Sequence, residues 1–167
     1  MSELDITPIQ AVFISYKAKV NASVPTVWKV LLDKIRRPDK YVPGVVKVEI
    51  LKELGPNAIE RRMETATGQV IAETISADAL TKTVLFKHHN DPKLSGMVTN
   101  VVYEENDGKD VFVEFVMSWT AKSIDSSEED KKIFEEMKAR MSAGMIKGAV
   151  LKTKEHAEAA EKETKEQ

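Results

Sequence analysis

Two oppositely charged residues, Arg61 and Glu73, are candidates for a polar site because an expected hairpin places them opposite each other. Segment 66–68, Ala-Thr-Gly, is typical of a three-residue hairpin loop with glycine where the backbone needs a positive φ. This loop pairs Thr65 with Gln69 and sets Arg61 opposite Glu73 on one face of the hairpin. The neighbouring pairs on that face are apolar: Met63 with Ile71, and Ile59 with Ile75.

The Arg61–Glu73 pair has two interpretations, which depend on the face that it occupies. On a concave, partly dry face, the two charges compensate each other and can orient the polar end of a ligand in an apolar pocket. On an exposed face, the pair is an ordinary cross-strand salt bridge that contributes at most about 1 kcal/mol. Both interpretations remain open from the sequence.

A methionine stripe marks the C-terminal part of the chain, where Met137, Met141 and Met145 recur every four residues. Unbranched methionine side chains adapt to varied shapes, so this stripe can line a ligand cavity. The alternative is that it forms ordinary core. Gly144 and Gly148 lie near the same stripe, where they indicate close helix packing, a kink or space for a ligand.

Histidine and basic residues give weaker indications of chemistry. His88 and His89 are adjacent on an expected strand, so they point to opposite faces and cannot bind one metal ion together. His88 can face a cavity beside Phe86 as an acid or base, or it can lie at the rim. A basic cluster (Lys34, Arg36, Arg37 and Lys40) could approach anionic lipid headgroups or could be a solvated helix end. We find no nucleophile elbow and no phosphate-binding loop, and we expect no metal and no cofactor.

The composition is that of an ordinary globular protein of 167 residues, with 42% hydrophobic and 31% charged residues. The absence of cysteine excludes disulfides, thiolate metal sites and cysteine nucleophiles. A formal net charge of −2 argues against nucleic-acid binding, which needs a basic excess. No apolar run is long enough for a transmembrane helix, and the N-terminus is acidic before its first apolar stretch. We therefore expect a cytoplasmic protein.

These candidate residues require a scaffold of strands followed by a helix. A strand over 12–20 precedes a helix that begins near Ser23 and ends before Pro38, and a second short helical turn covers 39–41. Alternation and turn signals then predict antiparallel strands over 45–51, 58–65, 69–77, 81–89, 96–105 and 110–121. One long helix follows residue 123, and after Lys152 its apolar stripe gives way to a polar sequence.

These elements predict an α+β helix-grip fold, in which a curved antiparallel sheet of about seven strands wraps around a long C-terminal helix. Two short helices follow the first strand. We assign residues 1–152 to a single domain and residues 153–167 to a polar helical extension or frayed tail.

The segment 20–51, VNASVPTVWKVLLDKIRRPDKYVPGVVKVEIL, resembles the opening of the START-like, or SRPBCC, superfamily of helix-grip proteins. Within it the chain is most similar to the AtaL-like branch over about residues 10–150. The matching residues are Trp28, Pro38, Tyr41, Arg61-Arg62 and Glu73. This superfamily includes birch-pollen-allergen relatives and polyketide cyclases, so the resemblance implies a pocket for an apolar or amphipathic small molecule. It does not supply a reaction.

We expect a lipid-like or polyketide-like molecule to bind between the sheet and the C-terminal helix, and we lean against an enzyme. The expected ligand-binding residues are Arg61, Met63, Glu73, Phe86, Tyr103, Phe115, Met117, Trp119, Met137, Met141 and Met145. The first alternative is a cyclase- or hydrolase-like enzyme acting on a polyketide-type substrate, with Glu73 and either His88 or Tyr103 as the acid and base. The second alternative is a protein-interaction module that uses the terminal helix.

Overall fold

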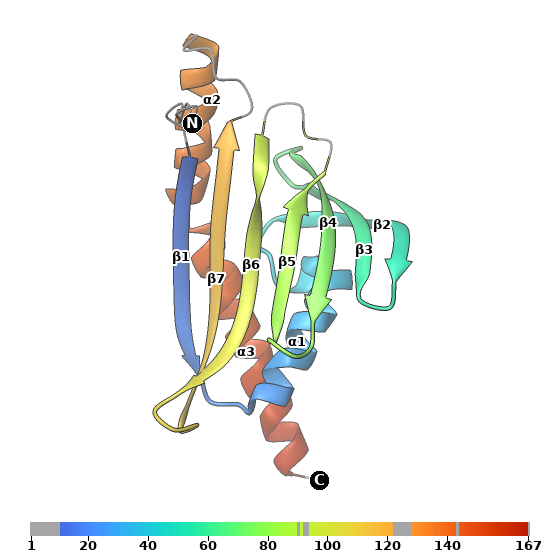
Figure 1. Ribbon diagram of the computed structural model, residues 1–167, viewed down its shortest axis with the longest axis vertical. Coiled ribbons are helices and arrows are strands. Elements are labelled where there is room, and N and C mark those ends of the chain that lie inside the picture. Colours follow the sequence, from blue (N-terminus) through green and yellow to red (C-terminus); the bar gives the residue numbers. More distant parts are fainter. Residues whose placement is uncertain (1–10, 90, 92–93, 122–127, 143, 167) are drawn as a thin grey trace, which may run out of the picture.

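The computed structural model describes residues 11–89, 91, 94–121, 128–142 and 144–166 of the chain. One seven-stranded sheet runs in the order β1-β7-β6-β5-β4-β3-β2 (Figure 1). Every neighbouring pair is antiparallel. The strands are β1 (Ala11–Val20), β2 (Val45–Gly55), β3 (Ala58–Thr65), β4 (Val70–Asp78), β5 (Thr83–His88), β6 (Leu94–Glu105) and β7 (Asp110–Ala121).

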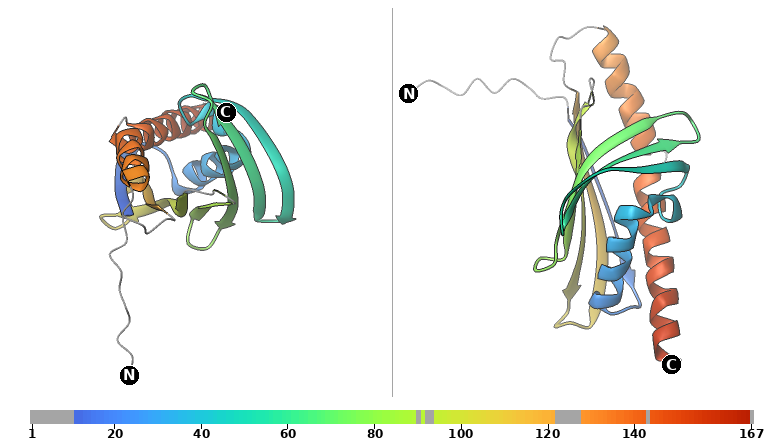
Figure 2. Two further views of the ribbon diagram at one scale, coloured as in Figure 1. Left: turned by 90° about the horizontal axis from the view of Figure 1, so that it is seen from above. Right: turned by 90° about the vertical axis from the view of Figure 1, so that its right-hand side faces the viewer.

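Four helical segments accompany the sheet: α1 (Val24–Arg36), the 3-10 turn η1 (Pro38–Lys40), α2 (Glu128–Ser142) and α3 (Met145–Lys165). The helices α1 and α3 lie on the concave side of the curved sheet, where they contact each other (Figure 2). This arrangement confirms the predicted α+β helix-grip fold, with the two short helices after the first strand.

The core lies between the concave face of the sheet and these two helices. Alternate residues of β7 are buried there as the sequence predicted, namely Val113, Phe115, Met117 and Trp119. Val27 and Leu31 of α1 and Val150 of α3 pack against them in the same apolar cluster. The sheet face and the helix stripes therefore bury one another, as amphipathic elements must.

Strands β6 and β7 approach closely at Gly96, which has a φ of 133°. A Cβ atom added there would collide with the backbone carbonyl oxygen of Ser118 and lie 2.8 Å from the Cα of Trp119. Because only glycine avoids both the steric overlap and the backbone strain, this position fixes the strand that carries Trp119 against its neighbour.

The single long C-terminal helix expected from the sequence is divided into α2 and α3. Gly144 is the N-cap residue of α3 and adopts a left-handed φ of 80°, which glycine tolerates without strain. Gly148 lies one helical turn later, and a Cβ there would be 3.1 Å from the ring of Pro43. Gly144 therefore allows the break between α2 and α3, and Gly148 allows α3 to pack closely against Pro43.

The segment 153–167, expected to be a solvated extension or frayed tail, is helical as far as Lys165 and packs on the domain. Thr153 and Ala157 are buried on α3, which packs against both β1 and α1. Glu161 accepts a hydrogen bond of 2.6 Å from the Thr26 hydroxyl and one of 3.2 Å from the Ser23 backbone N–H. These hydrogen bonds lower the pKa of Glu161 to about 2, with that from Thr26 making the largest contribution.

Candidate functional site

The β3–β4 hairpin has the predicted register and carries the predicted ion pair. Arg61 lies opposite Glu73, and the flanking apolar pairs also match the prediction. The guanidinium donates a hydrogen bond of 2.6 Å from Nη2 to Oε2 of Glu73. The side chains are only 2% and 8% exposed, so the interpretation as an exposed surface salt bridge is wrong.

Arg61 also holds the C-terminal end of α1. Its Nη1 donates to the carbonyl oxygens of Lys34 at 3.1 Å and Ile35 at 2.6 Å. These carbonyls belong to the last turn of the helix, whose partial negative charge favours a nearby cation. One guanidinium therefore joins the hairpin to the helix and fixes the position of Lys34 relative to Glu73.

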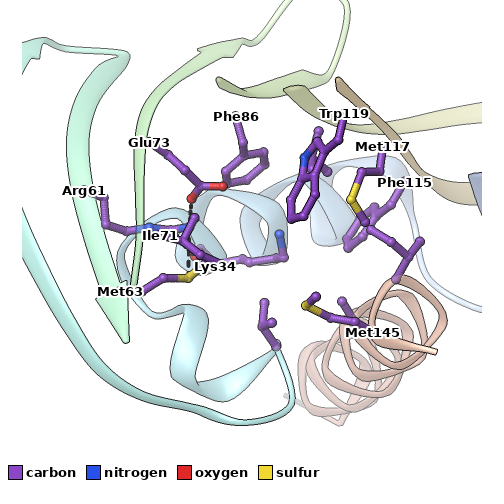
Figure 3. A pocket seen from close by; sticks show the side chains of 14 residues that line it. Lys34, Arg61, Met63, Ile71, Glu73, Phe86, Phe115, Met117, Trp119 and Met145 are labelled. Atoms are coloured by element: carbon purple, nitrogen blue, oxygen red, sulfur yellow. Dashed lines mark hydrogen bonds and ion pairs between the residues drawn. The ribbon is translucent and has the colours of Figure 1, made fainter. Parts of the chain in front are cut away.

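Lys34 is a buried cavity residue, although the sequence predicted it in a basic surface cluster. Its side chain extends from α1 into the space enclosed by the sheet (Figure 3). The amine donates a hydrogen bond of 2.8 Å to Oδ1 of Asn100, on β6. It also lies 4.3 Å from the ring centroid of Phe86 and 4.7 Å from that of Phe115.

Burial dominates the electrostatics of Lys34, which is 5% exposed. Desolvation first and the positive charge of Arg61 second lower the pKa of Lys34 to about 7, and the charge of Glu73 partly opposes this shift. Near neutral pH the amine is therefore divided between its neutral and charged forms. A lysine whose pKa is lowered by burial in this way is suited to act as a base or as a nucleophile.

A cavity of about 60 Å³ separates these groups from α3. It lies between the concave face and the start of α3, and its walls are mainly apolar (Figure 3). Most of the predicted ligand-binding residues line it: Arg61, Met63, Glu73, Phe86, Phe115, Met117, Trp119 and Met145. The remaining lining residues were not predicted from the sequence: Lys34, Val42, Ile71, Val98, Ile146 and Ala149.

Three predicted ligand-binding residues are not placed at this cavity. Tyr103 lies on the opposite, convex face of β6, where its hydroxyl donates to Oε2 of Glu114 at 3.0 Å and its ring stacks on Phe112. It therefore does not line the cavity, and it cannot act there with Glu73. The side chains of Met137 and Met141, on α2, lie outside the described residues.

His88 lies on the concave face of β5, directly opposite Glu73 in the β4–β5 register. Its ring meets the indole of Trp119 edge-on, with the ring centroids 4.7 Å apart and the planes at 69°. The imidazole is thus placed behind Trp119 and beside Glu73, and it is not among the residues that line the cavity.

Three buried donor groups have no hydrogen-bond partner within the described part of the chain. They are Nε of Arg61, Nδ2 of Asn100 and Nε1 of Trp119. Leaving a buried donor unpaired costs about 1–3 kcal/mol. Arg61 and Trp119 line the cavity, and the amide of Asn100 is held beside the Lys34 amine. An oxygen-bearing molecule in the cavity could accept hydrogen bonds from such groups.

The basic cluster does not form a free cationic patch. Lys34 is buried, and each of the other three cations lies beside a carboxylate: Arg36 with Glu53, Arg37 with Asp39, and Lys40 with Asp33. Among the described residues, no group of three or more His, Asp or Glu side chains could hold a metal ion. None of the helices that the structure describes is both long and apolar enough to span a membrane.

The architecture is similar to that of several solved structures. The Zhui aromatase/cyclase from Streptomyces sp. R1128 matches with a TM-score of 0.68 and 16% identity, covering 90% of this chain and 98% of that protein. The di-domain aromatase/cyclase BexL from the BE-7585A biosynthetic pathway matches with a TM-score of 0.67 and 15% identity. The match covers 93% of this chain but 53% of BexL, so this chain spans about half of that protein.

The protein TTHA0849 from Thermus thermophilus matches with a TM-score of 0.65 and 14% identity, covering 89% of this chain and 99% of that protein. At these identities, the likeness establishes a shared fold.

A search of curated protein sequences finds no match. The sequence profile of the AtaL family, described as acetylaranotin biosynthesis cluster protein L, matches residues 15–160. This match extends from the first strand well into α3, and the chain therefore belongs to the AtaL family.

Proposed function

We propose that the chain binds an amphipathic, polyketide-like or lipid-like small molecule in the cavity between the sheet and α3. The observation that carries the proposal is the buried set of Lys34, Arg61 and Glu73 in the wall of an otherwise apolar cavity. Ligand sites combine apolar walls with a few well-placed polar groups in this way. The apolar part of the ligand would contact Phe86 and Trp119, and its oxygen-bearing end would face the charged groups.

The unpaired donors support a ligand that carries oxygen acceptors. A carbonyl or carboxylate oxygen would satisfy the Arg61 or Trp119 donor and would recover part of the cost of burying it. An all-hydrocarbon ligand would leave these groups unpaired. The site therefore favours a molecule with at least one oxygen-bearing end over a plain hydrocarbon.

The cavity volume of about 60 Å³ limits what can enter without rearrangement. It corresponds to the space for roughly four water molecules, which is enough for one end of a ligand. A larger ligand requires the walls to move. Three methionines border the cavity: Met63, Met117 and Met145. Their flexible side chains can change conformation most easily to enlarge it.

The similar structures described as aromatase/cyclases favour a polyketide-type ligand over other amphipathic molecules. They also favour a second candidate function, cyclisation of such a ligand. Glu73 lines the cavity and could act there as an acid or base, whereas its register partner His88 lies against Trp119 and could reach the ligand only if that indole moved. Loss of turnover in Glu73→Gln, with ligand affinity unchanged and the variant shown by circular dichroism to be folded, would favour the enzyme, whereas binding without turnover in wild type would favour a carrier.

A cavity-filling substitution tests the binding site. Ala149 of α3 is buried against the cavity, whereas Ala159 lies exposed on the same helix. We expect wild type and Ala159→Leu to bind naphthoate, an aromatic carboxylate, in calorimetric titrations, and Ala149→Leu to bind it at least about tenfold more weakly. Circular dichroism and thermal unfolding would establish that each variant is folded. Equal affinity in all three proteins, or no binding by wild type, would contradict the proposal.

A further inference from the structure

Lys34 is the buried titratable group whose surroundings support a specific reaction. Its amine lies in the cavity wall between two aromatic rings, and it is hydrogen-bonded to Asn100 on the facing strand. We propose that this amine forms an imine with a ketone or aldehyde carbonyl of the bound molecule. This inference rests on the proposed function, because the cavity that would hold the carbonyl is the proposed binding site.

The environment of the amine supports its role as a nucleophile. Only a neutral amine has the lone pair that attacks a carbonyl carbon. Because burial first and Arg61 second lower the pKa of Lys34 to about 7, its neutral fraction at pH 7 is roughly a thousandfold greater than that of an ordinary lysine. Phe86 and Phe115 provide an apolar surrounding that water would otherwise fill.

The neighbouring amide can activate the carbonyl. Oδ1 of Asn100 accepts the hydrogen bond from Lys34, and this leaves Nδ2 of the same amide beside the amine as an unpaired donor in the described structure. If the carbonyl oxygen approached this amide while its carbon contacted the Lys34 nitrogen, Nδ2 could donate a hydrogen bond to it. Asn100 is fully buried, so this donor has little access to bulk water.

The reaction balances without an oxidant or a reductant. The amine lone pair forms a bond to the carbonyl carbon, and the carbonyl π electrons move to oxygen. A proton passes from nitrogen to that oxygen to give a carbinolamine. The carbon–oxygen bond then breaks, the oxygen leaves as water with a second proton from nitrogen, and a carbon–nitrogen double bond remains. With a β-diketone the imine rearranges to a conjugated enaminone, which absorbs in the near ultraviolet.

Acetylacetone, a small β-diketone, is a suitable probe for this amine at pH 7. Among the lysine side chains we expect one fast adduct, seen as an enaminone absorbance and an increase in intact mass, and located at Lys34 by peptide mapping, which also separates it from any adduct at an α-amino group. It should form roughly tenfold or more faster than adducts at exposed lysines, because the neutral fraction of the amine is so much larger. Its rate should fall as the pH is lowered below 7.

Two variants of the same helix provide the comparison. Lys34→Arg keeps a cation but cannot form an imine, and we expect it to lose the fast adduct. Lys29→Arg changes an exposed lysine of α1 and should retain it. Peptide mapping of wild type is decisive even if Lys34→Arg does not fold. A fast adduct at another lysine, or none at all, would overturn the proposal.

The two proposals fail separately. If naphthoate binds and acetylacetone gives no fast adduct at Lys34, the imine is wrong and the binding site stands. If the adduct forms at Lys34 and naphthoate does not bind, the amine is reactive and the proposed binding of an amphipathic ligand is wrong.

Discussion

Replacing Lys34 by methionine should alter how the stability of the protein depends on pH. The unfolded chain holds this proton up to an ordinary lysine pKa of 10.5, whereas burial, with a further contribution from Arg61, lowers the pKa of Lys34 in the folded chain to about 7. Between these values the unfolded state binds more protons than the folded state. The free energy of unfolding must therefore rise with pH across this interval.

The magnitude follows from the size of the pKa difference. The interval from about 7 to 10.5 corresponds to about 5 kcal/mol of stability gained at high pH. Because the amine is already half neutral at the lower limit, about 2 kcal/mol of this falls between pH 7 and pH 9. Lys34→Met also removes the hydrogen bond to Asn100, but that loss is present at every pH and does not change the slope.

Urea unfolding of wild type, Lys34→Met and Lys29→Met at pH 7, 8 and 9 measures this slope. The difference in unfolding free energy between wild type and Lys34→Met should shift by about 2 kcal/mol in favour of wild type as the pH rises. Arg61 and Glu73 are present in all three proteins, so the comparison isolates the loss of the Lys34 amine. Lys29 is exposed, so Lys29→Met should follow wild type. If the unfolding free energies of wild type and Lys34→Met changed equally with pH, the lowered pKa of Lys34 would be refuted.

The remaining predictions concern the ion pair, the strand contact and the C-terminal helix. Glu73→Gln should destabilise the protein by about 3–5 kcal/mol in urea unfolding because it leaves Arg61 charged and buried, whereas Arg61→Met/Glu73→Met should cost less than this single change. Gly96→Ala should cost about 3 kcal/mol or more through overlap with β7. Gly68→Ala, which meets strain but no neighbouring atom, should cost about 1 kcal/mol in the same assay; equal losses would contradict the overlap. Since the pKa of Glu161 is lowered to about 2, its stabilisation is present above pH 4.5 and is lost as the pH falls through 2, so thermal unfolding of Glu161→Gln should show a deficit that shrinks with acidification; a constant deficit would contradict this.

The hairpin register could be predicted because local signals determine it. A glycine loop sets which residues pair, and a one-residue slip would transfer the apolar residues beside Arg61 to the wrong face. The burial of this pair could not be predicted from the hairpin alone. It depends on α1, whose terminal carbonyls accept hydrogen bonds from Arg61.

Lys34 shows how residue type can mislead where spacing is informative. It follows Val27, Val30 and Leu31 at intervals that place all four on one helix face, and all four are buried. Its charge and its basic neighbours favoured a surface cluster instead. Tyr103 was misplaced for the opposite reason, because apolar residues occur on both faces of β6 and its hydroxyl is satisfied by Glu114 on the convex side.

The burial of the C-terminal part of α3 could not be predicted from its own sequence, for a physical reason. After Lys152 its apolar residues are all alanines, a pattern that is typical of a solvated helix. Ala157 and Thr153 are nevertheless buried, because α3 packs against β1 and α1. Whether these residues are covered depends on where α1 lies, and the sequence of the tail carries no information about that.

The protonation state of Lys34 should affect ligand binding and imine formation in opposite ways. With the amine neutral, Arg61 and Glu73 compensate each other and the site has no excess charge, which suits an uncharged carbonyl. An anionic ligand instead favours the ammonium, so binding it takes up a proton and strengthens as the pH falls toward and below 7. Imine formation needs the neutral amine and strengthens in the other direction. Opposite pH trends for naphthoate affinity and acetylacetone reactivity would therefore trace both effects to one nitrogen.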